Sequence, residues 1–168
     1  IKNYGAVIIS DYCKGYLSEE IMAKISKMHD KVFLDTKKLL GDWCDDMAYI
    51  KINYYEHART KHLLKKSLYD QLIITLGSNG CEHRGKTYPV EKVEIKDSSG
   101  AGDTFIAGLV AEYLKNYSID DAIHFANQCA TKVVQKKGVS VIWKRFLQMG
   151  VLIFYIVAIL SYWNIVNH

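Results

Sequence analysis

Short apolar runs alternate along the chain with segments whose apolar positions recur at helical spacing. Continuous apolar runs predict strands buried on both faces, and they occur at 6–9, 32–34, 49–52 and 72–76. Helical spacing and helix-starting residues predict helices at 19–29, 54–66, 103–115 and 119–136, and a last short strand is expected at 139–142. Repeated alternation of strand and helix predicts an α/β fold with a mainly parallel sheet flanked by helices.

One stretch between the predicted strands and helices admits two interpretations. Residues 81–95 are predicted to form short antiparallel strands that turn at 84–86. Residues 80–87 also satisfy the pattern G-x-x-x-x-G-K-[ST], the phosphate loop of a separate class of nucleotide hydrolases. A working phosphate loop leads directly into a helix, whereas the residues after Thr87 are typical of a strand. We therefore interpret the pattern as accidental and predict a hairpin.

The last part of the chain differs in composition from the rest. The run 146–166 is 21 residues long, carries no charged side chain and is almost entirely apolar. About 20 such residues cross a bilayer as a helix, and the preceding Lys144 and Arg145 and the aromatic Trp163 fit a span whose N-terminal side is cytoplasmic. The alternatives are a buried helix or a tail foreign to the fold, such as a frame-shifted end. Residues 1–142 and 143–168 are therefore treated as separate regions.

Composition narrows the function classes. The chain has 168 residues, 49% hydrophobic and 24% charged, which fits a folded globular protein and excludes a disordered or collagen-like chain. The net charge of +4 is mild, so we expect no nucleic-acid partner. Four cysteines lie far apart without a C-x-x-C pair, which indicates reduced thiols and a cytoplasmic location for residues 1–142.

The segment 97–105, with the sequence DSSGAGDTF, carries the clearest chemistry. A helix is predicted to begin at about Asp103, so the free N–H groups of Gly100, Ala101 and Gly102 would point at one spot and form an anion hole suited to phosphate. A carboxylate at this place would repel phosphate, so its presence there indicates a separate chemical role. Asp103 is therefore a candidate general base that takes a proton from an attacking hydroxyl. The alternative is a glycine-rich turn with Asp103 as a helix cap.

This segment resembles the second signature of the PfkB (ribokinase-like) carbohydrate kinases, D-[ST]-x-G-A-G-D. Other motifs of these kinases follow in the same order: N-x-x-E at 53–56, T-x-G-x-x-G at 75–80, and the stretches at 126–127 and 138–140 that close over the adenine. Residues 7–15 and 34–37 resemble the heptose-7-phosphate kinase branch. The resemblance extends over nearly all of 4–142. It implies the C-terminal part of a ribokinase-like α/β domain, truncated on its N-terminal side, with most sugar-binding residues upstream.

The resemblance also implies roles for single residues. Asp103 would be the catalytic base, and Gly100, Ala101 and Gly102 the anion hole. Asn53 and Glu56 would orient Mg²⁺ through water, although a helix cap and a solvated face explain the same two residues.

The nucleotide would be contacted by a further set of residues. Thr75, Gly77 and Gly80 would bind it, with a strand-ending turn as the alternative. Asn127 would lie beside it, with a satisfied buried amide as the alternative. Lys14 and Lys37 could contact phosphate, with ordinary surface lysines as the alternative.

Taken together, the resemblance implies an ATP- and Mg²⁺-dependent phosphotransferase acting on a hydroxyl of a sugar or sugar phosphate. The branch implies heptose 7-phosphate and the biosynthesis of ADP-heptose for lipopolysaccharide. ATP and a sugar phosphate would be its partners, and a homodimer is left open. Two other hypotheses stand beside this one: a catalytically dead remnant that still binds nucleotide, and an accessory domain tethered to the membrane through 146–166.

Overall fold

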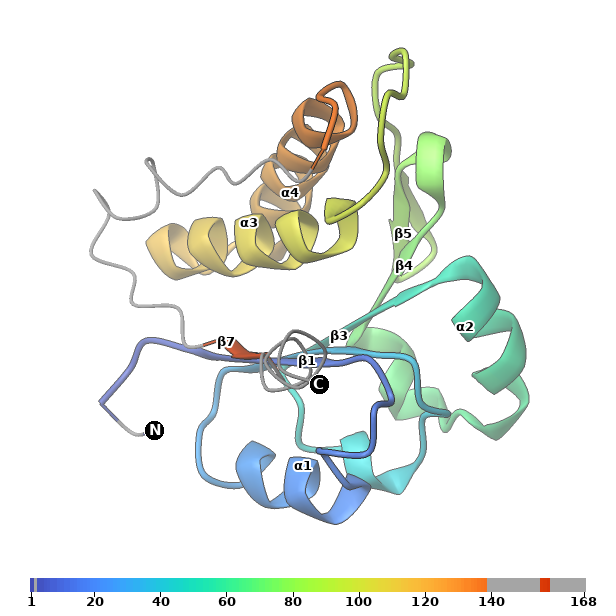
Figure 1. The fold of residues 1–168 in the computed structure, drawn as a ribbon. Coiled ribbons are helices and arrows are strands. Elements are labelled where there is room, and N and C mark those ends of the chain that lie inside the picture. The colour runs from blue at the N-terminus through green and yellow to red at the C-terminus, as the bar shows by residue number, and fades with distance from the viewer. Residues whose placement is uncertain (2, 139–154, 158–168) are drawn as a thin grey trace, which may run out of the picture.

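The computed structural model describes residues 1, 3–138 and 155–157. These residues form a seven-stranded sheet in the order β6-β5-β4-β3-β2-β1-β7 (Figure 1). The strands are β1 (Val7–Asp11), β2 (Val32–Thr36), β3 (Tyr49–Asn53), β4 (Leu72–Thr75), β5 (Cys81–His83), β6 (Lys86–Tyr88) and β7 (Tyr155–Val157). Strands β1 to β4 and β7 are parallel, and β5 and β6 are antiparallel. The prediction of an α/β fold with a mainly parallel sheet is confirmed.

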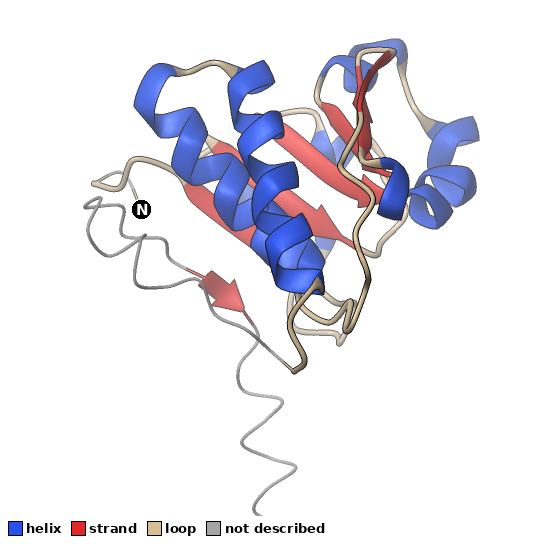
Figure 2. Ribbon diagram, turned by 90° about the horizontal axis from the view of Figure 1, so that it is seen from above, coloured by secondary structure: helices blue, strands red, loops and turns tan. Residues whose placement is uncertain are grey.

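Both faces of the sheet are covered, because successive strand residues point to opposite sides. Val7 and Ile9 belong to the core on the face of α1 (Glu19–Ser26), whereas Ile8 between them packs on the face of α3 (Ala101–Asn116) and α4 (Ile119–Val134). Figure 2 shows the two long helices lying together across one face of the sheet. Strands β1 to β4 are largely buried on both sides, as their continuous apolar runs predict.

The links between the parallel strands lie on the α1 face. Helix α1 joins β1 to β2, and a 3-10 turn at Asp42–Cys44 joins β2 to β3. Helix α2 (Tyr54–Thr60) and the 3-10 turns Lys61–Leu63 and Lys66–Asp70 join β3 to β4. The helix predicted at 54–66 is therefore too long. Its later part is broken where Leu64 and Lys65 adopt extended backbone angles.

Helices α3 and α4 approach each other closely at a glycine. A Cβ atom added to Gly108 would lie 3.2 Å from Sγ and 3.3 Å from Cβ of Cys129, and 3.4 Å from Cα of Ala126. Side chains on one helix thus fill the space left by the missing side chain on the other. The contact fixes how far α3 stands from α4.

The predicted hairpin is present between β5 and β6. Its two turn residues, Arg84 (φ 52°) and Gly85 (φ 73°), both have positive φ, as the tightest hairpin turns require. Strand β6 ends at Tyr88, and Pro89, which has no N–H for a strand ladder, begins an irregular loop. Strand structure is therefore confirmed for 81–88 and wrong for 89–95. No helix follows Thr87 directly, so the backbone lacks the form of a phosphate loop.

Two predictions concern the end of the chain. The strand predicted at 139–142 lies outside the described residues, and so does most of 146–166. The described part of that run, Tyr155–Val157, is strand β7, which pairs with β1 in parallel. Among the residues that the structure describes, no helix has the length and apolar character to cross a membrane.

Candidate active site

The site lies where the parallel strands end beneath the start of α3. Strand register places Ser10 beside Asp35, and Asp35 beside Lys51. Their alternation with core residues puts all three on the face that α3 covers, as for Ile8 and Phe33 two positions earlier. A polar row therefore crosses three strands at their carboxyl ends, where α/β folds bind ligands.

Helix α3 starts two residues earlier than predicted. Gly100 is its N-cap and has a left-handed backbone (φ 75°), which glycine adopts without strain. The N–H of Ala101 donates to the carbonyl of Ser98 at 3.2 Å, so this predicted anion-hole donor is engaged within the turn. The N–H groups of Gly102 and Asp103 belong to the first turn, where no intrahelical acceptor exists. Of the predicted anion-hole residues, Ala101 thus has its N–H engaged, whereas Gly100 and Gly102 remain predictions.

Asp103 contacts a tyrosine that lies 91 residues earlier in the chain. The hydroxyl of Tyr12, just after β1, lies 2.7 Å from both carboxylate oxygens of Asp103. Burial, followed by this hydrogen bond, raises the pKa of Tyr12 well above its ordinary value, so Tyr12 remains a proton donor. Lys37 lies over the ring of Tyr12, with Nζ 5.1 Å from the centroid. Lys14 is exposed in the loop after β1.

A buried ion pair adjoins Asp103. Lys51 Nζ lies 2.7 Å from Asp35 Oδ2, and the two side chains are 9% and 15% exposed. Burial raises the pKa of Asp35, Lys51 opposes that rise, and the charge of Asp103 adds to it. Neither Lys51 nor Tyr12 is among the site residues predicted from the sequence. The available signal for Lys51 was one charged residue within the apolar run 49–52.

Asn53 and Glu56 form a capping box at the start of α2. Asn53 Oδ1 accepts from the N–H of Glu56 at 2.9 Å, and Glu56 Oε2 accepts from the N–H of Asn53 at 2.7 Å. The helix-cap alternative for Asn53 is therefore correct, and a role toward Mg²⁺ stays a prediction. Within 1, 3–138 and 155–157, no group of three or more His, Cys, Asp or Glu side chains is placed to hold a metal. Mg²⁺ that keeps most of its waters does not need such a group.

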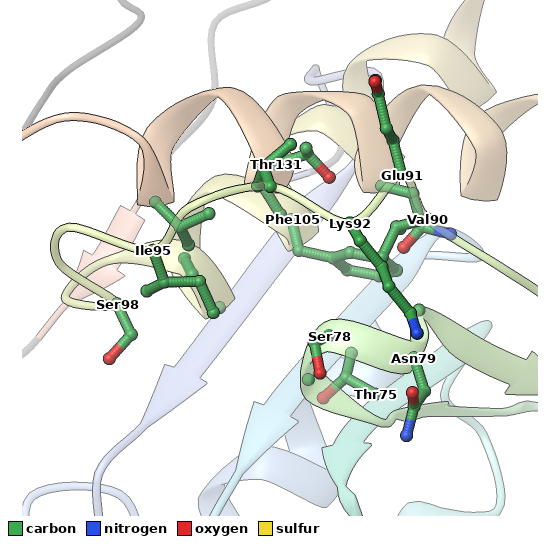
Figure 3. Close-up of a pocket in the computed structure, with 18 residues that line it drawn as sticks. Thr75, Ser78, Asn79, Val90, Glu91, Lys92, Ile95, Ser98, Phe105 and Thr131 are labelled. Carbon is green, nitrogen blue, oxygen red and sulfur yellow. The ribbon is translucent and has the colours of Figure 1, made fainter.

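A cavity of about 510 Å³ opens between the turn after β4 and the loop 90–98 (Figure 3). The predicted nucleotide residues Thr75, Gly77, Gly80 and Asn127 all line it, together with Ala101 and Gly102 of the helix start. Figure 3 shows Phe105 between the loop and the turn, with Lys92 extending from the loop toward the turn. The loop residues and Phe105 were missed, because nothing in the sequence ties a loop to a turn 15 residues away.

Two of these cavity residues also have structural tasks. A Cβ atom added to Gly80, whose φ is 85°, would lie 2.0 Å from the carbonyl oxygen of Tyr88, so only glycine fits there. The amide nitrogen of Asn127 donates to that same carbonyl at 3.0 Å. The satisfied buried amide proposed as an alternative for Asn127 is therefore present, and the residue still borders the cavity.

Solved structures with this architecture are ribokinase-like kinases. A nucleoside kinase of Methanocaldococcus jannaschii, an archaeal member of the ribokinase family, superposes with a TM-score of 0.67 at 22% identity over 89% of this chain and 56% of that chain. Arabidopsis thaliana ribokinase, solved with ribose and ATP, gives 0.68 at 20% identity over 88% of this chain and 56% of its own. The chain therefore has the ribokinase-like fold.

Sequence comparison identifies the family. The model of the pfkB family carbohydrate kinases matches residues 45–145, and the chain belongs to this family. The bifunctional protein HldE of Sulfurimonas denitrificans is 31% identical over 160 residues, covering 82% of this chain and 34% of the relative. HldE of Helicobacter pylori (strain 26695) is 31% identical over 161 residues, covering 82% and 35%. The chain thus spans about a third of the length of these relatives.

Proposed function

We propose that this chain is the nucleotide-binding and catalytic part of an ATP-dependent kinase that phosphorylates a hydroxyl of a sugar phosphate. The substrate class follows the resemblance of 7–15 and 34–37 to the heptose-7-phosphate kinase branch and the similarity to HldE. Heptose 7-phosphate is therefore the proposed acceptor.

The observation that carries the proposal is the position of Asp103 in the helical turn that borders the cavity. Ala101 and Gly102 line the cavity, and Asp103 is the next residue of the same helical turn. A nucleotide in the cavity would extend its phosphates toward the positive end of α3. The transferred phosphoryl group would then arrive beside the one carboxylate of that turn.

The chemistry assigned to these residues is a simple displacement. The acceptor hydroxyl oxygen bonds to the terminal phosphorus, the bond from that phosphorus to the ADP oxygen breaks, and the hydroxyl proton passes to Asp103. The N–H of Gly102, which lines the cavity, would offer a hydrogen bond to a phosphoryl oxygen. The contact with Tyr12 supports the role of Asp103, since its carboxylate is placed to accept a hydrogen bond from a hydroxyl group.

Mg²⁺ would be held through water by Glu56 and Asn53, whose orientation the capping box fixes at the end of β3. Oxygen donors suit this ion, and the capping bond engages only one carboxylate oxygen of Glu56, Oε2. When bound, Mg²⁺ would offset the charge of the phosphates.

Calorimetry of the 168-residue chain with Mg-ATP tests the proposal. We expect the chain to bind Mg-ATP and the Thr131→Trp variant to lose that binding, because the larger side chain would fill the cavity from its wall. The surface variant Lys24→Trp, on the opposite face, should keep it. Absence of binding by the unsubstituted chain at millimolar Mg-ATP contradicts the proposal. Equal binding by Thr131→Trp places the nucleotide elsewhere and contradicts it as well.

A further inference from the structure

We propose that Lys51 is a phosphate-binding residue of this site: its ammonium group, held against Gly102 by Asp35, binds the terminal phosphate of a nucleoside triphosphate. This inference rests on the proposed function and adds to it a residue from the middle of the sheet.

The strand places the lysine. Lys51 lies in β3 between Ile50 and Ile52, which both pack in the core on the α1 face. Alternation therefore directs Lys51 toward α3, and the residue is only 7% exposed. Its apolar stem is covered by the fold, and its Nζ ends 2.7 Å from Asp35 Oδ2.

The first turn of α3 leaves space for the ammonium group of Lys51 at Gly102. A Cβ atom added to Gly102 would lie 2.9 Å from Lys51 Nζ, closer than real Cβ atoms approach such a neighbour. Gly102 is not among the glycines with positive φ, so its backbone does not require glycine. Glycine inside a helix costs about 1 kcal/mol relative to alanine. The missing side chain here makes room for Lys51 beside the first turn of α3.

The charges around the site require a cation. Asp35 and Asp103 lie close enough for the charge of Asp103 to raise the pKa of Asp35. A phosphate that enters between two carboxylates is repelled by both of them. Lys51 is the buried positive charge at this place, and burial strengthens its attraction because water screens it less. A buried ion pair alone adds little to folding stability, so a purely structural pair accounts poorly for this arrangement.

The position also selects which phosphate is bound. Gly102 borders the nucleotide cavity, and Asp103 is the proposed acceptor of the hydroxyl proton. The phosphate between them is the one being transferred, since the phosphate already present on the sugar lies away from the reacting hydroxyl. Lys51 should therefore contribute to the binding of ATP far more than to that of ADP.

The test compares the affinities of the 168-residue chain for Mg-ATP and Mg-ADP by calorimetry. In Lys51→Met we expect the affinity for Mg-ATP to fall about 10- to 100-fold, as for the loss of a hydrogen bond to a charged group, and that for Mg-ADP to fall less than about 3-fold. Lys38→Met is the matched control, because Lys38 lies 3.8 Å from the buried carboxylate of Asp11 on the opposite face of the sheet. Its two affinities should not change.

Lys51→Met leaves the carboxylate of Asp35 without its cation, which could disturb folding. A second variant separates that effect from the loss of phosphate binding. Asp35→Asn combined with Lys51→Met removes both charges, and we expect the same selective loss of Mg-ATP affinity. Equal changes for ATP and ADP in both variants overturn the inference while the proposed function stands. If the unsubstituted chain binds neither nucleotide, the inference and the proposed function fail together.

Discussion

The hydroxyl of Tyr12 donates a hydrogen bond to the carboxylate of Asp103, from a position 2.7 Å from each carboxylate oxygen. This bond ties the end of β1 to the first turn of α3 across 91 residues of sequence. An acceptor hydroxyl that gives its proton to Asp103 must approach the same oxygens. The Tyr12 hydroxyl therefore occupies the position where we expect the acceptor hydroxyl to bind. The acceptor must either bind beside Tyr12 or displace it from Asp103.

Asp103→Asn is expected to remove most phosphoryl transfer. Asparagine keeps the size of the side chain and an oxygen at the helix start, but it cannot take the proton, and general base catalysis contributes about 10²–10⁴-fold. Mg-ATP affinity should stay equal or rise slightly, because a negative charge beside the phosphates is gone. ADP release is measured in a fusion to the upstream kinase segment of the Sulfurimonas relative, which is expected to supply the sugar-binding residues. Equal turnover of variant and parent chain rules out Asp103 as the base.

Tyr12→Phe is expected to lower the free energy of unfolding by about 1 kcal/mol. It removes a hydrogen bond to a charged group, and partial exposure keeps the effect toward the low end. Tyr16→Phe is the control, since Tyr16 lies in the same loop and is 49% exposed. Urea unfolding of both variants provides the measurement. Equal stability of the two variants would show that the bond to Asp103 adds nothing to folding.

Lys86→Ala is expected to leave Mg-ATP binding unchanged. Lys86 belongs to the hairpin, where its Nζ lies 2.7 Å from Asp120 Oδ1 and over the ring of Tyr88. It is absent from the residues that line the large cavity. Calorimetry decides the matter, and a large loss of affinity would restore the phosphate-loop interpretation of 80–87.

Acid is expected to destabilise the fold through His83. Burial lowers the pKa of this side chain, whose Nδ1 lies 2.7 Å from the carbonyl of Leu72. As the pH falls through about 6.5, His83 takes up a proton in the unfolded chain but not yet in the folded chain. The contribution of His83 to the free energy of unfolding is therefore fully present above that pH and is lost as the pH falls below it. The slope for one such proton is up to about 1.4 kcal/mol per pH unit.

His83→Asn provides the check on that slope. Asparagine can still donate to the Leu72 carbonyl but does not titrate. Urea unfolding between pH 7.5 and 5 should show a shallower loss of stability in the variant than in the parent chain. A remaining slope is expected from His57, whose pKa is also lowered by burial. Superimposable slopes for variant and parent would exclude His83 as a source of acid sensitivity.

Local patterns predicted most of the fold, because the strands are continuous apolar runs and the helices start at marked caps. Ser18 and Ser118 cap α1 and α4 as their acidic first turns indicate. The glycine-rich segment likewise predicted Asp103 and its helix. The ion pair of Asp35 with Lys51 was not predictable in this way, because it depends on which strands become neighbours and in which register. Tyr12 and the loop 90–98 were missed for the same reason, since their partners lie far away along the chain.

The close approach of α3 to α4 has a mechanical consequence. Gly108 lies five residues beyond Asp103 on the same helix, or about 7.5 Å along its axis. A rigid helix transmits displacement along its length, so added bulk at Gly108 or on the thiol of Cys129 would move the first turn of α3, and the Asp103 carboxylate with it. The alignment of the groups that we propose to react would thus depend partly on a contact in the interior of the protein.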